Sequence, residues 1–379
     1  MSQIQSPPLS SRRALLTTVS AITIIAGIGL RLLAALQGDN YDMESWWIVS
    51  EGIRSGESVY TATHRYNYGP IWAYIIGGLR YLSALSGPDT ITRLHLFITG
   101  FLSLADVGIG LLLASWGSPW LFPLFLLNPI SVIVTGYHIQ FDNLAILIGL
   151  VGWARFVEGS TTRDTILAGL IFGSSLATKH LFIVFLAWVP FLTIKREKTQ
   201  RLLFASTSLK VFLLSFVPFA FDPASLEGMK RNVFQYVSTE GHSLINALNF
   251  AASTFPDRTL FMVIVAFLGV ALGCLGRLGN NAPLFYLCAL TALSSGMARN
   301  YLAIPLVAVT LWRHLPTSWL YICVALLALV TVNPSLGVSE VVQPLSTTPL
   351  ITYELAQLAL LALLIDAYAR EGRKGYKGT

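Results

Sequence analysis

Charged residues are scarce in this chain of 379 residues. Asp, Glu, Lys and Arg make up only 12% of it, whereas a soluble domain averages about 25%. Hydrophobic residues reach 54%, and the mean hydropathy is +0.65. Too few charges remain to cover a soluble surface of this size, so the composition excludes a water-soluble globular protein and a disordered chain.

Cysteine motifs and nucleotide-binding loops are also lacking. The three cysteines, Cys274, Cys288 and Cys323, lie inside apolar runs without a CxxC or Cys/His metal spacing. Serine-hydrolase elbows, Walker loops, GxGxxG turns and HExxH helices are missing as well. The formal net charge of +6 does not indicate a nucleic-acid partner, because most Lys and Arg lie in short connectors where they orient membrane helices.

Long apolar runs are what the chain has instead. A membrane helix needs about 20 apolar residues, and the sequence predicts an all-α integral membrane protein, a polytopic helical bundle of about twelve spans, with a range of about 10 to 13. We expect one transmembrane domain over 1–379. The expected spans are 14–36, 68–87, 91–114, 141–157, 163–178, 181–194, 201–220, 258–277, 281–298, 300–313, 316–333 and 349–369.

Basic clusters set the expected orientation. Arg12 and Arg13 precede the first run, and four basic residues lie within 195–201, so the positive-inside rule predicts that both are cytoplasmic. The acidic segment 37–67 is then external only if 116–136 does not cross the membrane. We therefore predict a re-entrant hairpin at 116–136, broken by its prolines. The same topology makes 221–257 a second external loop and places both termini in the cytoplasm.

Acidic and aromatic residues are concentrated in the predicted first external loop, 37–67. Its stretch 43–55 interleaves Trp46 and Trp47 with polar residues, which indicates an amphipathic helix on the membrane surface with the tryptophans at the headgroups. Asp39 and Asp42 precede it. These carboxylates are either a solvated pair or a general base at the mouth of a membrane cavity, with a possible divalent cation, Mg²⁺ or Mn²⁺.

Five further polar motifs follow in order. The second apolar run is preceded by RYNYGP, with Arg65, Tyr66 and Tyr68. Residues 126–144, LLNPISVIVTGYHIQFDNL, contain His138, Gln140 and Asp142. Lys179 and His180 end the segment AGLIFGSSLATKH. INALNF ends 238–250, and SGMARNYLAIP at 295–305 contains Arg299, Asn300 and Tyr301.

Taken together over roughly residues 14–310, this order of motifs resembles the GT-C class of membrane glycosyltransferases. It is most similar to enzymes that use polyprenyl-phosphate mannose, such as the mannosyltransferase of GPI-anchor synthesis, and shares part of the lipid-linked glucosyltransferase pattern. The strict D-x-D of the mannosyl branch is absent, because Asn40 stands at its first position when Asp42 is the second. Alignment on Asp39 instead matches the glucosyl branch.

The resemblance implies transfer of a sugar, mannose preferred, from a polyprenyl-phosphate donor to a glycan or glycolipid hydroxyl, with inversion, on the non-cytoplasmic face. Asp42 or Asp39 would be the general base. Lys179, His180 and Arg299 would bind the donor phosphate. The expected substrate-binding residues are Arg65, Tyr66, Tyr68, His138, Gln140, Asp142, Asn300 and Tyr301. A prokaryotic cytoplasmic membrane is favoured over the endoplasmic reticulum, and the sequence leaves a partner subunit undecided.

Two alternatives stay open. Asp106 and Lys210 lie inside apolar runs, where ionisable residues are costly and mark either function or a buried pair. With the broken segment 116–136 they suggest a secondary transporter, although a structural pair between Asp106 and Lys210 is the simpler interpretation. A non-catalytic scaffold that resembles an enzyme is the third interpretation.

Overall fold

Helices follow most of the predicted apolar runs, but 181–194 forms only short 3-10 turns and 300–313 is divided between a 3-10 turn and a short helix. The structure is a computed structural model that describes residues 9–38, 40–235, 257–276, 278–294, 299–331 and 348–375, and every regular element in these ranges is a helix. The α-helices are α1 Leu9–Ala35, α2 Tyr41–Arg54, α3 Val59–Ala62, α4 Pro70–Leu85, α5 Ile91–Trp116, α6 Leu121–Leu126, α7 Pro129–Gly136, α8 Asp142–Glu158, α9 Thr162–Thr178, α10 Lys198–Ser215, α11 Pro223–Met229, α13 Asp257–Cys274, α14 Ala282–Ala292, α15 Leu306–Leu311, α16 Pro316–Thr331 and α18 Thr348–Gly375. Tighter or wider turns are η1 His180–Phe182, η2 Val184–Ala187, η3 Val189–Phe191, η4 Val217–Phe219, η5 Lys230–Phe234 and η6 Arg299–Ala303.

Several of these helices can cross a membrane. Four are long and apolar enough, namely Thr18–Ala35, Ile91–Trp116, Lys198–Phe219 and Thr352–Arg370. A fifth results if Thr162–Thr178 and His180–Phe191, bent by 110° at their junction, count as one span. The all-helical architecture is therefore confirmed for the described residues, and the long apolar helices are compatible with the predicted membrane protein. The number of about twelve crossings stays a prediction, since other apolar runs form helices of 10–17 residues.

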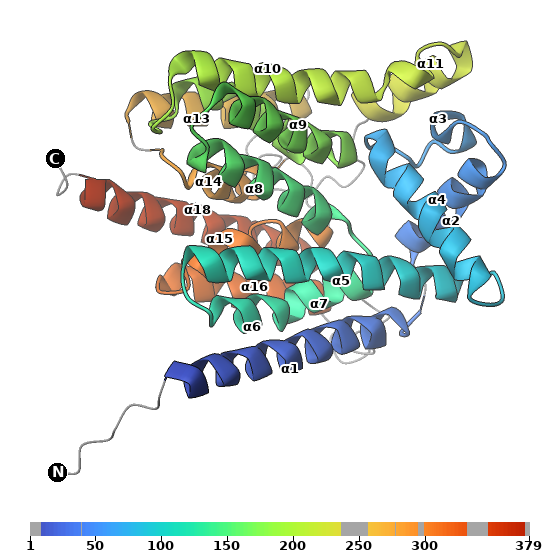
Figure 1. Ribbon diagram of the computed structural model, residues 1–379, viewed down its shortest axis with the longest axis horizontal. Coiled ribbons are helices and arrows are strands. Elements are labelled where there is room, and N and C mark those ends of the chain that lie inside the picture. Colours follow the sequence, from blue (N-terminus) through green and yellow to red (C-terminus); the bar gives the residue numbers. More distant parts are fainter. Residues whose placement is uncertain are drawn as a thin grey trace.

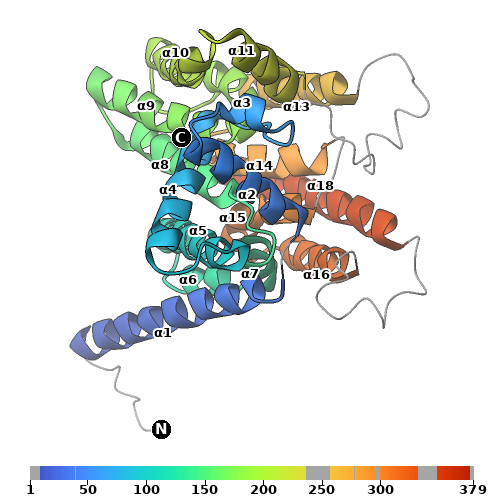
Figure 2. The same cartoon turned by 90° about the vertical axis from the view of Figure 1, so that its right-hand side faces the viewer.

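The predicted external segments gather at one end of the bundle. Figure 1 shows α2, α3 and α11 at the right, whereas the N-terminal end of α1 and the C-terminal end of α18 lie at the left. Figure 2 looks onto this gathered end. Asn232 Nδ2 donates to the Thr63 carbonyl at 3.1 Å across 169 residues of sequence. The loops 37–67 and 221–257 therefore meet, although residues 236–256, with the INALNF motif, lie outside the described part.

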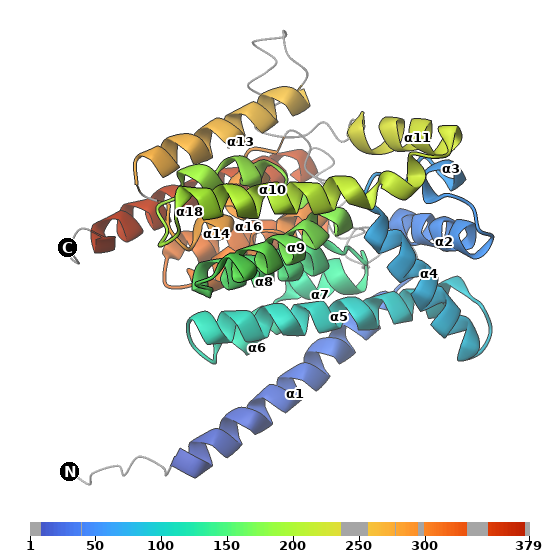
Figure 3. The ribbon, with the colours of Figure 1, turned by 45° about the horizontal axis from the view of Figure 1, so that its top comes forward.

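The first helix joins the bundle mainly through its C-terminal part. α1 packs on α5, α6 and α7 and diverges from the other helices toward its N-terminal end (Figure 3). Segment 116–136, which it contacts, forms the short helices α6 and α7. Asn128 separates them, and its Oδ1 accepts from Ile130 N at 2.9 Å. Neither helix has the length to cross a membrane alone, and the re-entrant placement stays a prediction.

The predicted amphipathic helix is α2, but one expectation about its tryptophans is wrong. Trp46 is 1% exposed, and its ring contacts those of Tyr68, Trp72 and Phe141 at centroid distances of 5.6–5.9 Å. It is a core residue and does not sit at the lipid headgroups, because α4 packs onto that face of α2. Trp47 is partly buried under the guanidinium of Arg80, 3.7 Å from the ring centre.

Gly69, which precedes α4, makes the closest backbone approach at this end. A Cβ there would lie 2.0 Å from the carbonyl oxygen of Ala177 on α9. Because backbone cannot swing aside, Gly69→Ala should destabilise the chain by about 1–3 kcal/mol through overpacking. Gly78→Ala is the matched control, since a Cβ at this α4 position meets nothing within 4 Å and alanine favours helix. Thermal unfolding in detergent compares the two variants, and equal melting temperatures would contradict the clash.

Candidate functional site

A hydrogen-bonded chain joins three distant segments at the gathered end. Gln140 Nε2 donates to Asp42 Oδ2 at 2.7 Å, and Asn300 Nδ2 donates to Gln140 Oε1 at 3.1 Å. These contacts span 98 and 160 residues of sequence. Gln140 is 4% exposed, so its two bonds are shielded from competing water. Three of the residues expected at the site are thus brought into direct contact.

Asp42 occupies the first turn of α2. Asn40 is the N-cap, and its Oδ1 accepts from the backbone N–H groups of Asp42 and Met43, each at 3.0 Å. A carboxylate in the first turn is favourable because the N-terminal end of a helix carries partial positive charge. Asp42 is only half-buried, so it can meet a substrate from outside the helix bundle. Asp39 lies outside the described residues.

Lys179 and Asp142 form a buried ion pair beside this chain. Lys179 Nζ lies 2.7 Å from Asp142 Oδ2, and both side chains are at least nine-tenths buried. The ammonium also lies 4.9 Å from the ring centre of Phe141 and 5.1 Å from that of Tyr68. Asp142 Oδ1 has no hydrogen-bond partner in the described part of the chain. The lysine expected at a phosphate is therefore already balanced by a carboxylate.

A small cavity lies beneath Gln140 and Asp142. Its volume is about 20 Å³, and its polar lining comes from Asp106, Ser131, Thr135, Gln140, Asp142 and Asn143. That is room for about one water molecule, whereas a ligand pocket usually holds about 300–1,000 Å³. A sugar ring does not fit there, so a substrate would bind on the outer side, where Asp42 is accessible.

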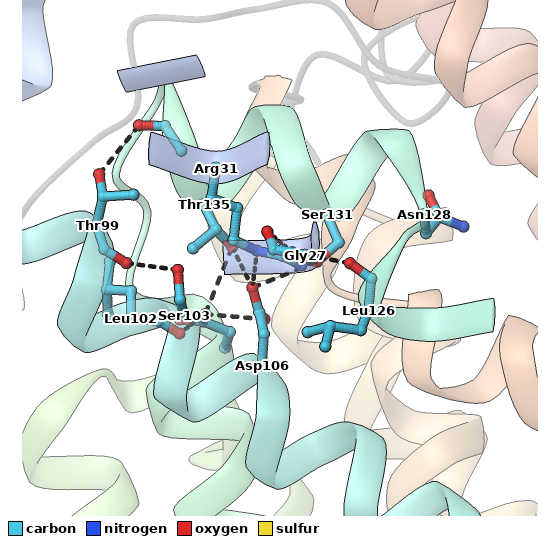
Figure 4. Close-up of polar contacts among 12 residues, drawn as sticks. Gly27, Arg31, Thr99, Leu102, Ser103, Asp106, Leu126, Asn128, Ser131 and Thr135 are labelled. Atoms are coloured by element: carbon cyan, nitrogen blue, oxygen red, sulfur yellow. Dashed lines mark hydrogen bonds and ion pairs between the residues drawn. The ribbon is translucent and has the colours of Figure 1, made fainter. Parts of the chain in front are cut away.

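Deeper in the bundle, Arg31 and Asp106 form a fully buried ion pair (Figure 4). Arg31 Nε lies 2.8 Å from Asp106 Oδ2, and its other nitrogens donate to the carbonyls of Gly27 and Leu126 and to Ser131 Oγ. Thr135 Oγ1 and Asn143 Nδ2 donate to the two Asp106 oxygens at 2.8 and 2.9 Å.

The expected pairing of Asp106 with Lys210 is therefore wrong. Lys210 is exposed on α10, and α10 packs on α9, whereas α1 and α7 pack on α5 around Asp106. Arg31, near the C-terminal end of the first apolar run, was the overlooked partner. An arginine inside a membrane span is itself the sequence signal that would have found it. The charge of Asp106 is thus balanced within the chain by Arg31, Thr135 and Asn143, and the transporter stays an alternative.

Tyr66 also takes a structural position. It is fully buried, and its hydroxyl donates to the Gly69 carbonyl and accepts from Ala73 N. Burial raises the pKa of the Tyr66 hydroxyl above its ordinary value, so the group stays uncharged. It links segment 37–67 to the start of α4, and this placement gives no support to the predicted contact with substrate.

The other expected site residues surround the same end. Tyr68 and Tyr301 are partly buried, His180 is half-buried in η1, and His138 is 6% exposed. Arg65 Nη1 lies 3.5 Å from Glu44 Oε2, and its guanidinium lies 4.1 Å from the Tyr41 ring centre. Arg299 opens η6, but its side chain lies outside the described part.

No metal-binding group of three or more His, Cys, Asp or Glu occurs among the described residues. Because Asp39 is not among them, the possible divalent cation at Asp39 and Asp42 stays a prediction. The geometry thus offers one accessible carboxylate held by an amide, next to a buried lysine.

Comparison of the chain with protein-family models and with curated proteins finds no match.

Proposed function

We propose that the chain is an integral membrane glycosyltransferase of the GT-C type. It moves a sugar, mannose preferred, from a polyprenyl-phosphate donor to a hydroxyl of a glycan or glycolipid. The observation that carries this proposal is the chain of hydrogen bonds from Asp42 through Gln140 to Asn300. All three residues belong to motifs that resemble this class, and they lie on three separate segments that only folding brings together.

Asp42 is the general base in this proposal. It takes the proton of the acceptor hydroxyl as that oxygen attacks the anomeric carbon. The bond from the anomeric carbon to the phosphate oxygen breaks, its electron pair leaves with the polyprenyl phosphate, and the configuration inverts. Gln140 holds Oδ2 of the carboxylate at 2.7 Å, which orients the base before the acceptor arrives. A divalent cation, where one is used, would contact Asp42 together with Asp39.

The leaving phosphate gains negative charge and needs fixed cations or donors nearby. Lys179 and His180 follow directly after α9, and η6 with Arg299 packs against α7, the helix just before Gln140. Asp142 neutralises Lys179 at 2.7 Å. A donor phosphate on the outer side of the site draws on the positive charge of this lysine while Asp142 stays paired with it. The membrane-length helices support a lipid-linked donor. The gathered loops support a site on the non-cytoplasmic face. The membrane we propose is, by preference, a prokaryotic cytoplasmic membrane.

A donor panel tests this proposal. The purified chain in proteoliposomes is given radiolabelled polyprenyl-phosphate mannose, polyprenyl-phosphate glucose or a nucleotide-linked mannose, with glycolipid acceptors and with or without Mg²⁺ or Mn²⁺. Label should move from a lipid-phosphate donor and not from the nucleotide sugar. Transfer of glucose alone would correct the sugar and keep the class. If every donor stays intact, the enzyme proposal fails, and sugar counterflow in the same vesicles tests a transporter.

A further inference from the structure

The side chain of Asn40 is bonded at both ends. Its Oδ1 caps α2 by accepting from Asp42 N and Met43 N, and its Nδ2 donates to the Tyr137 carbonyl at 2.6 Å. One amide thus joins the turn that carries Asp42 to the loop that carries Gln140. The two loops then meet a second time, through the bond from Gln140 Nε2 to Asp42 Oδ2.

The backbone is strained in the loop that follows Tyr137, whose carbonyl accepts the hydrogen bond from Asn40. Ile139 has φ +46°, and it is the one non-glycine residue with positive φ in the described ranges. A β-branched residue avoids this conformation, which persists only where surrounding contacts hold it. Here Gln140 N donates to the Val134 carbonyl at 3.2 Å, and the Ile139 side chain is fully buried. The bond from Asn40 adds a fixed point on the other side of Ile139.

From these contacts we infer that Asn40 is a positioning residue that holds the carboxylate of Asp42 within hydrogen-bonding distance of Gln140 Nε2. The inference rests on the proposed function. Asparagine alone suits both tasks, because capping needs an acceptor and the Tyr137 carbonyl needs a donor. Aspartate caps a helix as well as asparagine does but cannot donate, and the single hydroxyl of serine cannot reproduce both bonds.

Two substitutions test the role of Asn40. Asn40→Ser and Asn40→Asp both keep a capping acceptor and lose the bond to Tyr137. A displaced catalytic group costs on the order of 10²-fold in rate, so kcat for sugar transfer should fall by about tenfold to 100-fold with KM nearly unchanged. Asn40→Asp also adds a negative charge two residues from Asp42, which should move the acidic limb of the kcat profile to higher pH. Asn40→Ser should leave that limb in place.

The other titratable groups near this end are the same in both variants, so a difference in the acidic limb reports the added charge. They are Glu44, Arg65, His138, Asp142, Lys179 and His180. Thr161→Ala is the matched control. Thr161 is the N-cap of α9, and its Oγ1 accepts from Asp164 N. This end of α9 is remote from Lys179, which follows the other end. It should lower the melting temperature and leave kcat unchanged.

Hydrogen exchange of the Gln140 amide gives a readout that does not depend on activity. It should speed up in both Asn40 variants and stay unchanged in Thr161→Ala. Wild-type kcat and unchanged exchange in the Asn40 variants would overturn the inference. If the wild-type chain transfers no sugar, the proposed function fails by itself. Exchange then decides alone whether Asn40 fixes the loop, faster exchange supporting it and unchanged exchange overturning it.

Discussion

Replacing Asp42 by asparagine should lower the rate of sugar transfer by about 10²- to 10⁴-fold, the usual contribution of a positioned general base. Asparagine has nearly the same shape, and its Oδ1 can still accept the hydrogen bond from Gln140 Nε2. It cannot take a proton from the acceptor hydroxyl. The loss should therefore appear in kcat, with little change in donor KM or in the melting temperature.

Glu44→Gln is the matched control for this substitution. Glu44 is a carboxylate in the same first turn of α2, but its side chain is 61% exposed and lies 3.5 Å from Arg65. An exposed pair of this kind contributes little, so its neutral variant should keep near wild-type transfer. Equal losses in the two variants would show that the negative charge of the whole turn matters, and that Asp42 is not the specific base.

Lys179→Met should destabilise the chain by about 3–5 kcal/mol, because removal of one partner leaves a buried charge uncompensated. Asp142 would keep a carboxylate with one oxygen, Oδ1, already lacking a hydrogen bond in the described part of the chain. Adding Asp142→Asn to Lys179→Met removes that charge and should restore much of the lost stability. The single variant should also bind the donor more weakly, because His180 and Arg299 are then the only proposed phosphate-binding cations left.

Thermal unfolding in lipid nanodiscs measures the single and double variants side by side. Lys210→Met is the control, because this lysine is exposed on α10 and its loss should change stability little. A Lys179→Met chain as stable as wild type would mean that the ion pair is not the buried contact described above. A double variant less stable than the single one would contradict the charge argument.

The helices could be predicted from the sequence because lipid forces the backbone of an apolar run to bond to itself. The runs 91–114 and 163–178 became α5 Ile91–Trp116 and α9 Thr162–Thr178 almost residue for residue. The contact of Asp42 with Gln140 and Asn300 was expected only from the order of motifs that resemble a family. Nothing in their spacing alone brings residues 98 and 160 positions apart together.

Side-chain partners could not be predicted in the same way. Asp106 pairs with Arg31 and not with Lys210 because α1, rather than α10, packs beside α5, and periodicity does not reveal which helices are neighbours. Trp46 carries the signal of an interfacial anchor, but the packing of α4 buries it. Asn40 before an amphipathic helix is a recognisable N-cap, whereas its second bond, to Tyr137, depends on a loop about a hundred residues away.

The most direct test of the central claim follows donor cleavage in a single turnover. Wild-type chain in excess over polyprenyl-phosphate mannose, with glycolipid acceptor, is quenched at intervals, and polyprenyl phosphate and mannosylated product are separated. The account predicts that both appear together in equal amounts in the wild type and at least about 10²-fold more slowly in Asp42→Asn. Donor that stays intact in the wild type across both lipid-linked sugars, or an Asp42→Asn chain that cleaves it at the wild-type rate, would contradict the account.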